Sequence, residues 1–376
     1  MSSEMELSIP TIDLADLASS DRAVRMSAAN AIKDGFSIYG LVYVANHGVD
    51  LALRERVFDR FVDFTNRAPA EKEKLNRPDI WYQRGWTPPN TEQAVVAGGQ
   101  PDFKECYFAA PMPVDPDCRI EYPPIFADNV WPEGDEAFAE DYLALGQQLH
   151  EAGLGLLQGL SLALDLPPRG FDARLEGAAH VFRLLRYLPL AEDQLGKGIL
   201  WGEEHTDFNL LTLLPGGRFL DPEGKPCARP DDASGLFLRT RPTPEHPRGQ
   251  LVEGRAPAGC IVAQVGQELE ILTGGEVLAT PHVITAPKAP GYTRISAAHF
   301  LHLHPHQMVF PFEKYRTEET LRAYSPPVLA GTYSIKTLVD IGLAPKSALE
   351  SLGYRHYGRL ASIRAEEIRA EETSGG

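Results

Sequence analysis

The spacing of apolar residues in the first half of the chain predicts mostly helices, with a few strands between them. Residues 9–14 form a short β-rich run, and residues 21–33 carry apolar side chains at the spacing of one helix face. The run over 35–49 then alternates apolar and polar positions, which predicts a strand that ends at an Asn-His-Gly turn. Residues 54–64 and 136–164 again have helical spacing, and the second of these is rich in Leu and Ala.

From about residue 179 the pattern changes to short strands. Six β-rich runs follow one another with Gly or Pro between them, as is typical of a sandwich or barrel. They are HVFRLLRYL, NLLTLLP, GLFLRT, GCIVAQVG, PHVITAP and TRISAAHFL. After residue 312 the spacing is helical again, and the charged end of the chain is expected to fray.

No break in composition separates the helices from the strands, so we expect one α+β domain with helices packed outside a β core. Within it we distinguish a helical and strand region over 1–120 and helical support over 121–178. The β core covers 179–312, and helices with a frayed tail cover 313–376.

Composition narrows the class of protein. The 376 residues carry a formal charge of −16, so attraction to nucleic acid or to an anionic membrane surface is not expected. The chain starts without a basic and then apolar leader, and it has no apolar stretch long enough to span a bilayer. The four cysteines show no CxxC spacing. We therefore expect a cytoplasmic protein with reduced thiols.

One group of residues fits a metal. His205 and Asp207 lie two apart at the head of a β-rich run, where both would project from the same face. His282 lies in a later strand-like run and can supply a third ligand. Two imidazoles and a carboxylate on one face of an octahedron leave three positions open for substrates and dioxygen. Taken alone, these three residues are explained about as well by ordinary surface or core positions as by a metal site.

A second motif follows closely. Twelve residues after His282, the run TRISAAHF places Arg294 and Ser296 on one face of the next strand. A guanidinium forms a two-pronged pair with a carboxylate, and a hydroxyl adds a third hydrogen bond. These two side chains therefore predict a receptor for one end of a dicarboxylate, close to the metal.

In chain order, the motifs resemble those of the isopenicillin N synthase-like branch of the Fe(II)/2-oxoglutarate-dependent oxygenases. The resemblance covers most of the chain. It rests on IPTIDL, GFSIYGLVYVANHGV, QRGWTPP and PDFKECYF, and then on RLLRYLP, HTDFNLLTLL, VGQELEILTGG, TPHVI and RIS. It implies a double-stranded β-helix, or distorted jelly roll, as the core of the fold.

The resemblance also implies roles for residues. His205, Asp207 and His282 would be the iron ligands and the centre of catalysis. Arg294 and Ser296 would hold the distal carboxylate of 2-oxoglutarate, which Tyr187 would also reach. The family reaction uses dioxygen to oxidise a small organic molecule and gives succinate and carbon dioxide, and we expect a substrate from secondary metabolism.

Hydroxylation is the default outcome of that reaction, and desaturation or cyclisation are its variants. Two other functions stay open: an Fe(II) oxidase of the same fold that does not use 2-oxoglutarate, and a non-catalytic scaffold that binds a small molecule. The residues leave the primary substrate and the oligomeric state undetermined.

The sequence departs from the family pattern at a few places. Val283 stands where an Arg is usual, Gln267 where an Asp is usual, and Gly274-Gly275 replace Asn-Gly. The interval between the second and third candidate ligands is long, and the extra length lies over 216–234. This insertion fits a lid, a subunit contact or an extended hairpin.

Several other polar residues have structural explanations. In HFLHLHPH, His302 and His304 would share a strand face, but no acid or thiol lies beside them in the sequence, so we expect a packed or exposed strand end. His47 fits a loop-forming role. Arg183 and Arg186 point to opposite faces, so at most one faces the pocket.

The aromatic residues of IWYQRGWTPP, namely Trp81, Tyr82 and Trp86, either border the substrate cavity or simply pack. Packing is the favoured interpretation. For the pair Lys104-Glu105 in PDFKECYF, a structural ion pair is the simplest explanation.

Overall fold

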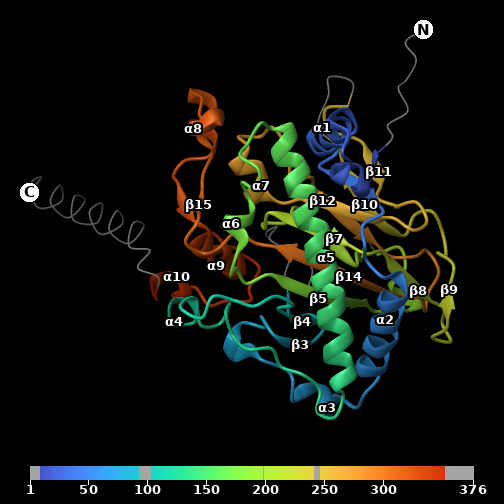
Figure 1. The fold of residues 1–376 in the computed structure, drawn as a ribbon. Coiled ribbons are helices and arrows are strands. Elements are labelled where there is room, and N and C mark those ends of the chain that lie inside the picture. The colour runs from blue at the N-terminus through green and yellow to red at the C-terminus, as the bar shows by residue number, and fades with distance from the viewer. Residues whose placement is uncertain (1–8, 93–102, 198, 241–245, 352–376) are drawn as a thin grey trace, which may run out of the picture.

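Two β-sheets and a layer of helices make up the molecule (Figure 1). The computed structural model describes residues 9–92, 103–197, 199–240 and 246–351. The larger sheet has ten strands in these ranges. Along its main path they are β1 (Thr11–Asp13), β2 (Leu41–Ala45), β12 (Ile261–Val265), β7 (Leu211–Leu214), β14 (Thr293–Leu301), β5 (Val181–Tyr187), β4 (Lys104–Ala109) and β3 (Gly85–Thr87), while β8 (Gly217–Leu220) pairs with β14 and β9 (Pro226–Cys227) with β8.

The smaller sheet faces the larger one across the interior. Its strands, in spatial order, are β11 (Leu251–Glu253), β10 (Gly235–Arg239), β13 (His282–Thr285) and β6 (Gly202–His205). A separate two-stranded ribbon joins β15 (Met308–Val309) to β16 (Val328–Leu329). Apolar side chains from both sheets meet between them, among them Tyr187, Trp201 and Ile284. Two facing sheets agree with the sandwich or barrel that the strand pattern predicted, and with the jelly roll that the resemblance implied.

The described residues form ten α-helices. They are α1 (Arg22–Ile38), α2 (Leu51–Thr65), α3 (Pro69–Glu73), α4 (Cys118–Glu121), α5 (Glu136–Ala163), α6 (Asp172–Leu175), α7 (Gln267–Leu272), α8 (Glu318–Ala323), α9 (Ala330–Asp340) and α10 (Ser347–Ser351), with 3₁₀ turns at Leu14–Ala18, Pro78–Ile80, Glu192–Gln194 and Glu313–Tyr315. In the described ranges, none is both long enough and apolar enough to cross a membrane.

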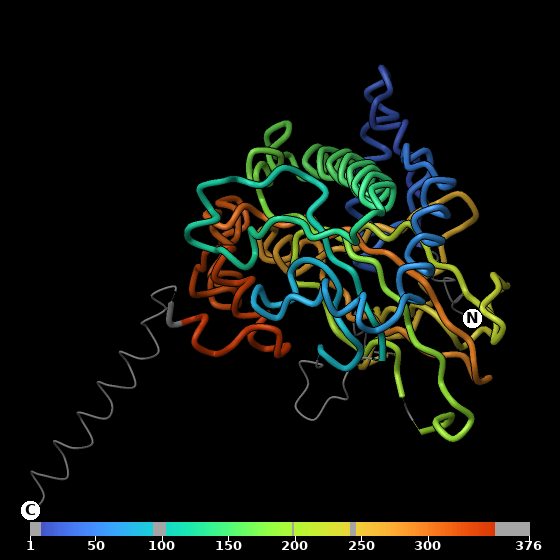
Figure 2. The backbone as a smooth tube through the Cα atoms, turned by 90° about the horizontal axis from the view of Figure 1, so that it is seen from below, coloured from blue at the N-terminus to red at the C-terminus, as the bar shows by residue number. Residues whose placement is uncertain are grey.

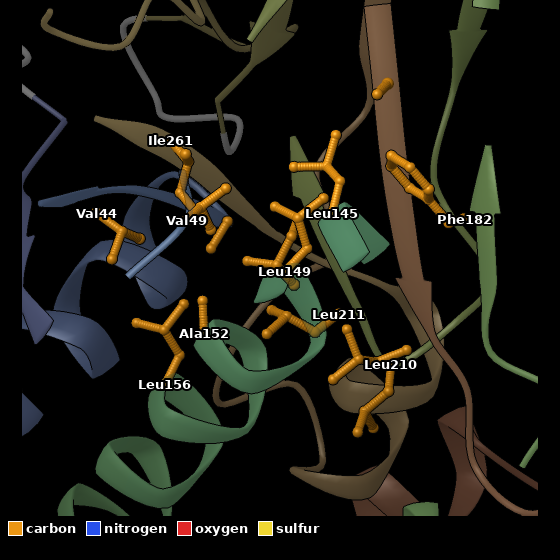
Figure 3. Close-up of a cluster of buried hydrophobic side chains, with 14 of the residues drawn as sticks. Val44, Val49, Leu145, Leu149, Ala152, Leu156, Phe182, Leu210, Leu211 and Ile261 are labelled. Atoms are coloured by element: carbon orange, nitrogen blue, oxygen red, sulfur yellow. The ribbon is translucent and has the colours of Figure 1, made fainter. Parts of the chain in front are cut away.

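Helix α5 covers the outer face of the larger sheet (Figure 2). It starts at Asp135, whose side chain accepts a hydrogen bond from the backbone N–H of Phe138 and so caps the first turn. Leu149 and Leu156 of the helix pack in one cluster with Leu211 of β7 (Figure 3). Gly153 lies so close to the sheet that a Cβ there would be 2.9 Å from Leu213. The helix therefore fixes one face of the sheet and leaves the other for the interior.

Strand β14 shows how the two faces are divided. Ile295, Ala297 and Leu301 belong to the cluster on the helix side. Arg294 and Ser296, one position out of phase, line the interior cavity. The period-2 alternation of a strand thus separates core residues from candidate ligand residues.

Most of the predicted elements are confirmed, and one boundary is wrong. The segment over 35–49 was predicted to be a strand from its start, but α1 continues to Ile38 and β2 begins only at Leu41. Ile32 and Phe36 are both fully buried and lie four apart, so the helix face continues past the expected end. The helical pattern expected after residue 312 is observed in α8, α9 and α10, and the residues beyond Ser351 lie outside the described part of the chain.

Three buried histidines lie between α5 and the larger sheet. His150 Nδ1 is 3.2 Å from His299 Nε2. His180 Nε2 is 3.0 Å from the carbonyl oxygen of Leu175, and its Nδ1 accepts a hydrogen bond from the backbone N–H of His302. Burial lowers the pKa of His150 to about 4 and holds the pKa values of His180 and His299 well below the usual range. All three are therefore neutral in the folded protein.

We predict that this group makes the fold sensitive to acid. A histidine with a depressed pKa stabilises the fold fully above its unfolded pKa of about 6.5, and that stability is lost as the pH falls toward the folded value. Each such group contributes up to about 1.4 kcal/mol per pH unit in that window. Urea unfolding at pH 7.5 and 5.5 should show a smaller pH effect for His150→Leu than for wild type. Replacing the exposed His246 is the control, and equal pH effects in all three proteins would contradict the prediction.

Candidate metal centre and its cavities

The structure brings His205, Asp207 and His282 together. Their ligand atoms all lie within 4.8 Å of one another. His205 Nε2 is 3.6 Å and His282 Nε2 is 3.8 Å from Asp207 Oδ1. Separations of this size allow all three atoms to bind one cation.

Two strands and a turn position these residues. His205 ends β6 and His282 begins β13, and the two residues are paired across the smaller sheet. The sequence had suggested that Asp207 lies on the same strand face as His205. This is wrong, because β6 ends at His205. Asp207 lies in the turn that leads from the smaller sheet to β7 of the larger one, and the turn aims its carboxylate back at both imidazoles.

Hydrogen bonds on the outer side set the orientation of each candidate ligand. His205 Nδ1 donates to the carbonyl oxygen of Glu203 at 2.7 Å, which leaves the Nε2 lone pair for a metal. Thr212 Oγ1 donates to Asp207 Oδ2 at 2.7 Å, so Oδ1 is the oxygen that faces the histidines. The side-chain amide of Gln264 lies 2.6 Å from His282 Nδ1. The contacting atom is the amide Nε2, and the carbonyl oxygen of Thr280 lies 3.4 Å from the same ring nitrogen, so both contacts engage Nδ1 and leave Nε2 of the ring for a metal.

Thr212 and Gln264 were not singled out from the sequence. They are direct neighbours on β7 and β12 of the larger sheet, and both line the larger cavity together with the three candidate ligands. Alternation along NLLTLLP places Thr212 opposite to the buried Leu211 and Leu213, which is the one sequence signal that could have indicated it. No comparable signal marks Gln264.

The environment keeps His282 neutral. Burial, followed by the nearby His205 ring, lowers the pKa of His282. The two ring centroids are 4.3 Å apart. A neutral imidazole is the form that binds metals, so His282 needs no deprotonation at neutral pH.

Arg294 places a cation across the same cavity. The residue is half-buried, its Nη1 is buried without a hydrogen-bond partner, the guanidinium is hydrogen-bonded to Tyr187, and among the described residues no carboxylate lies within ion-pair distance of it. Gly217 makes room for it, because a Cβ there would be 2.9 Å from Nη2. A buried charge without a counter-ion is costly, so this arrangement fits an anionic ligand.

Ser296 and Tyr187 lie beside this guanidinium. Tyr187 on β5 is paired with Arg294 on β14, and the guanidinium carbon is 5.4 Å from the centre of the tyrosine ring. Ser296 lies two residues along the same strand face. All three side chains line a cavity of about 610 Å³ that also reaches the three candidate metal ligands. The residues of the predicted carboxylate receptor thus share one cavity with the predicted metal site.

A smaller cavity of about 190 Å³ meets the candidate ligands from another side. Its walls are largely apolar and aromatic, and include Phe108, Phe208 and Phe300. Arg183 also lines it, and its Nη2 donates to both carboxylate oxygens of buried Glu92 at 2.6 Å. Arg186 points away and donates to Thr65 and Asn66. As predicted, only one of the two arginines faces a cavity.

The insertion over 216–234 forms part of the larger cavity. It contains β8, which pairs with β14 beside Arg294, and β9, which pairs with β8. Among the three interpretations weighed from the sequence, the extended hairpin is the one observed. Arg218 and Phe219 of the hairpin line the cavity wall.

The remaining sequence candidates have structural roles. His47 accepts a hydrogen bond from Val49 N–H and contacts Gly259 O, which fixes the loop after β2. Trp86 is buried and donates to Glu105, and neither cavity is lined by Trp81, Tyr82 or Trp86. Lys104 and Glu105 do not pair with each other. Lys104 contacts Glu92, whereas Glu105 contacts Lys72 on the other face of β4.

One expectation about the histidine-rich run is wrong. Strand β14 ends at Leu301, so His302 and His304 do not share a strand face. His302 lines the smaller cavity. His304 has both a thiol and an acid beside it, because Cys118 Sγ is 3.5 Å and Asp115 Oδ2 is 3.1 Å from its Nε2. These partners are distant in the sequence, and only the fold brings them together.

Comparison with known proteins agrees with this geometry. A family model described as the N-terminal part of the non-haem dioxygenases of morphine synthesis matches residues 9–134. The 2-oxoglutarate-dependent dioxygenase ecdK of Aspergillus rugulosus is 27% identical over 328 residues, which is 79% of this chain and 89% of that one. The isopenicillin N synthase of Streptomyces clavuligerus is 28% identical over 232 residues, which is 55% of this chain and 64% of that one.

A solved structure shows the same fold. A putative 2OG-Fe(II) oxygenase family protein from Caulobacter crescentus has a TM-score of 0.71 at 24% identity, and the match covers 89% of this chain and 99% of that one. Sequence relatives, fold and the order of the site motifs agree. The chain is therefore similar to Fe(II)/2-oxoglutarate-dependent oxygenases, including isopenicillin N synthase, in its N-terminal family match, its sequence relatives and its fold.

Proposed function

We propose that the protein uses Fe(II), 2-oxoglutarate and dioxygen to hydroxylate a small organic molecule, with succinate and carbon dioxide as co-products. The observation that carries this proposal is the guanidinium of Arg294, which has no carboxylate partner among the described residues, in the cavity that also contains the His205, Asp207 and His282 ligand atoms. A three-ligand metal site alone fits several metals and reactions. A carboxylate receptor beside it fits a dicarboxylate cosubstrate.

The chain's own residues hold and orient the reactants. His205 Nε2, His282 Nε2 and Asp207 Oδ1 would bind the iron, with Glu203, Gln264 and Thr212 fixing their orientation from the outer side. When bound, iron and 2-oxoglutarate supply the oxidising power for an unactivated C–H bond. Arg294 and Ser296 would hold the distal carboxylate, and Tyr187 supports the guanidinium from its ring face. The protein therefore contributes position and a dry environment.

The two cavities suggest where each reactant binds. We place 2-oxoglutarate in the larger cavity, next to Arg294, and the primary substrate in the smaller one, whose apolar walls fit a carbon skeleton. His205 and Asp207 line both cavities, so a metal held there would face both reactants. A role in secondary metabolism and a cytoplasmic location are part of this proposal.

An anaerobic binding experiment, followed by a succinate measurement, separates this function from the Fe(II) oxidase that the sequence left open. Metal-free protein receives Fe(II) and 2-oxoglutarate without oxygen, and the weak visible band of the iron chelate is recorded. Oxygen is then admitted, and succinate is measured. A band followed by succinate release supports the proposal. Bound iron without a band or succinate would refute the use of 2-oxoglutarate and favour the oxidase.

A further inference from the structure

A second group of potential metal ligands lies apart from the iron triad. Cys118, His304 and His306 have ligand atoms that all lie within 4.8 Å of one another. Cys118 begins α4, and the two histidines follow the end of β14. Figures 1 and 2 show α4 beside the C-terminal helices, and an apolar cluster joins Cys118 to Ile335 of α9.

Two carboxylates lie next to the group. Asp115 Oδ2 is 3.1 Å from His304 Nε2, and Glu121 Oε2 is 2.6 Å from His306 Nε2. Cys118 Sγ is 3.5 Å from the same His304 nitrogen. One nitrogen thus contacts both a thiol and a carboxylate. Separations of 3.1 Å and 3.5 Å are those between neighbouring ligand atoms of a tetrahedral metal with bonds of about 2.0–2.3 Å.

The backbone holds these segments in place without a metal. The N–H of Asp115 donates to Gly177 O, and the N–H of His304 donates to Arg174 O. Both segments are therefore anchored to the same short region around α6. The N–H of Gly331, at the start of α9, donates to Pro305 O between the two histidines. A site built this way has little ordering entropy to overcome when it binds an ion.

The charges favour a cation. Asp115 and Glu121 place two carboxylates against His304 and His306, next to the Cys118 thiol. A divalent ion that binds Cys118 would displace the thiol proton. His304 Nδ1 is only weakly engaged, since the His306 N–H that it accepts is 3.4 Å away. In the metal-free protein the ring proton is therefore on Nε2, which faces Asp115, and a metal at Nε2 requires this proton to move to Nδ1 with loss of only that weak hydrogen bond.

We propose that Cys118, His304 and His306 form a second metal site that takes Zn²⁺, with Asp115 as the nearest candidate for a fourth ligand. A thiolate, two imidazoles and a carboxylate are ligands that Zn²⁺ accepts, whereas Mg²⁺ and Ca²⁺ prefer oxygen ligands alone. A fourth protein ligand would leave no open position, as in structural zinc sites. The site would join the segment before α4 to the loop after β14. Asp115 contacts both His304 and Cys118, and its carboxylate must turn toward His306 to complete the tetrahedron.

Co²⁺ is the probe that distinguishes this site from the iron triad. Co²⁺ bound by a thiolate in a tetrahedral site gives a near-ultraviolet charge-transfer band and strong visible bands, which a six-coordinate nitrogen and oxygen site does not give. We expect the full-length metal-free protein to show these bands with Co²⁺ and to lose them when Zn²⁺ is added. Cys118→Ser should abolish the charge-transfer band, and Cys260→Ser, the matched control, should keep it.

Two further variants test the assignment. His282→Ala should keep the thiolate band and bind one Zn²⁺ where the wild type binds two. Asp115→Asn should weaken Co²⁺ binding at this site more than Glu121→Gln does. The proposal is overturned if no thiolate band forms, or if the band survives Cys118→Ser. The 2-oxoglutarate chelate band of Cys118→Ser with Fe(II) reports that this variant is folded.

Discussion

Replacing His282 with Ala should abolish oxidation of substrate and Fe(II) binding at the candidate metal site. His282 Nε2 and Asp207 Oδ1 lie 3.8 Å apart, and the loss of one imidazole leaves two candidate ligands of three. Loss of an outer hydrogen-bond partner typically costs about 10–100-fold in metal affinity, so loss of a direct ligand should cost more. Equilibrium dialysis of Fe(II) and succinate release would measure both effects. Retained iron affinity would refute the assignment of His282.

Thr212→Val provides a graded control for that experiment. The substitution keeps the shape of the side chain and removes the hydroxyl that donates to Asp207 Oδ2. We expect a loss of about 10–100-fold in Fe(II) affinity, with the site still able to turn over at high iron concentration. Because Thr212 touches no metal in the proposed arrangement, a complete loss in this variant would mean that the fold, not the ligand set, had been damaged.

Replacing Arg294 with Leu should abolish productive 2-oxoglutarate binding at ordinary concentrations. The guanidinium is the buried cation that would pair with the distal carboxylate, and truncating one partner of a buried charge pair costs about 2–5 kcal/mol. At about 1.4 kcal/mol per tenfold, this is roughly 30-fold to several thousand-fold in affinity. Anaerobic titration of the Fe(II) protein, followed by the chelate band, measures it directly.

The iron affinity of Arg294→Leu shows whether the substitution removes only the carboxylate receptor or also damages the metal site. Arg294→Leu should bind Fe(II) as the wild type does, because Arg294 contacts none of the three candidate ligands. Arg294→Lys should lie between Leu and wild type, since an ammonium keeps the charge but loses the two-pronged geometry. Unchanged 2-oxoglutarate affinity in Arg294→Leu would place the carboxylate receptor elsewhere in the cavity.

The sequence determined the elements and the ligand types because their signals are local. The strand period put Arg294 and Ser296 on one face of β14, and the structure keeps them together in the larger cavity. The helical spacing over 136–164 likewise predicted α5 to within a residue. Both signals depend only on side chains a few positions apart along one element.

The tertiary structure decided which distant residues meet. Asp207 reaches the histidines through a turn between two sheets, and a strand period could not predict that turn. Gln264 reaches His282 from β12, across the space between the sheets. Cys118 and His304 are 186 positions apart, and their contact results from the packing of α4 against the loop after β14. Such contacts depend on how whole elements pack, which local periodicity does not encode.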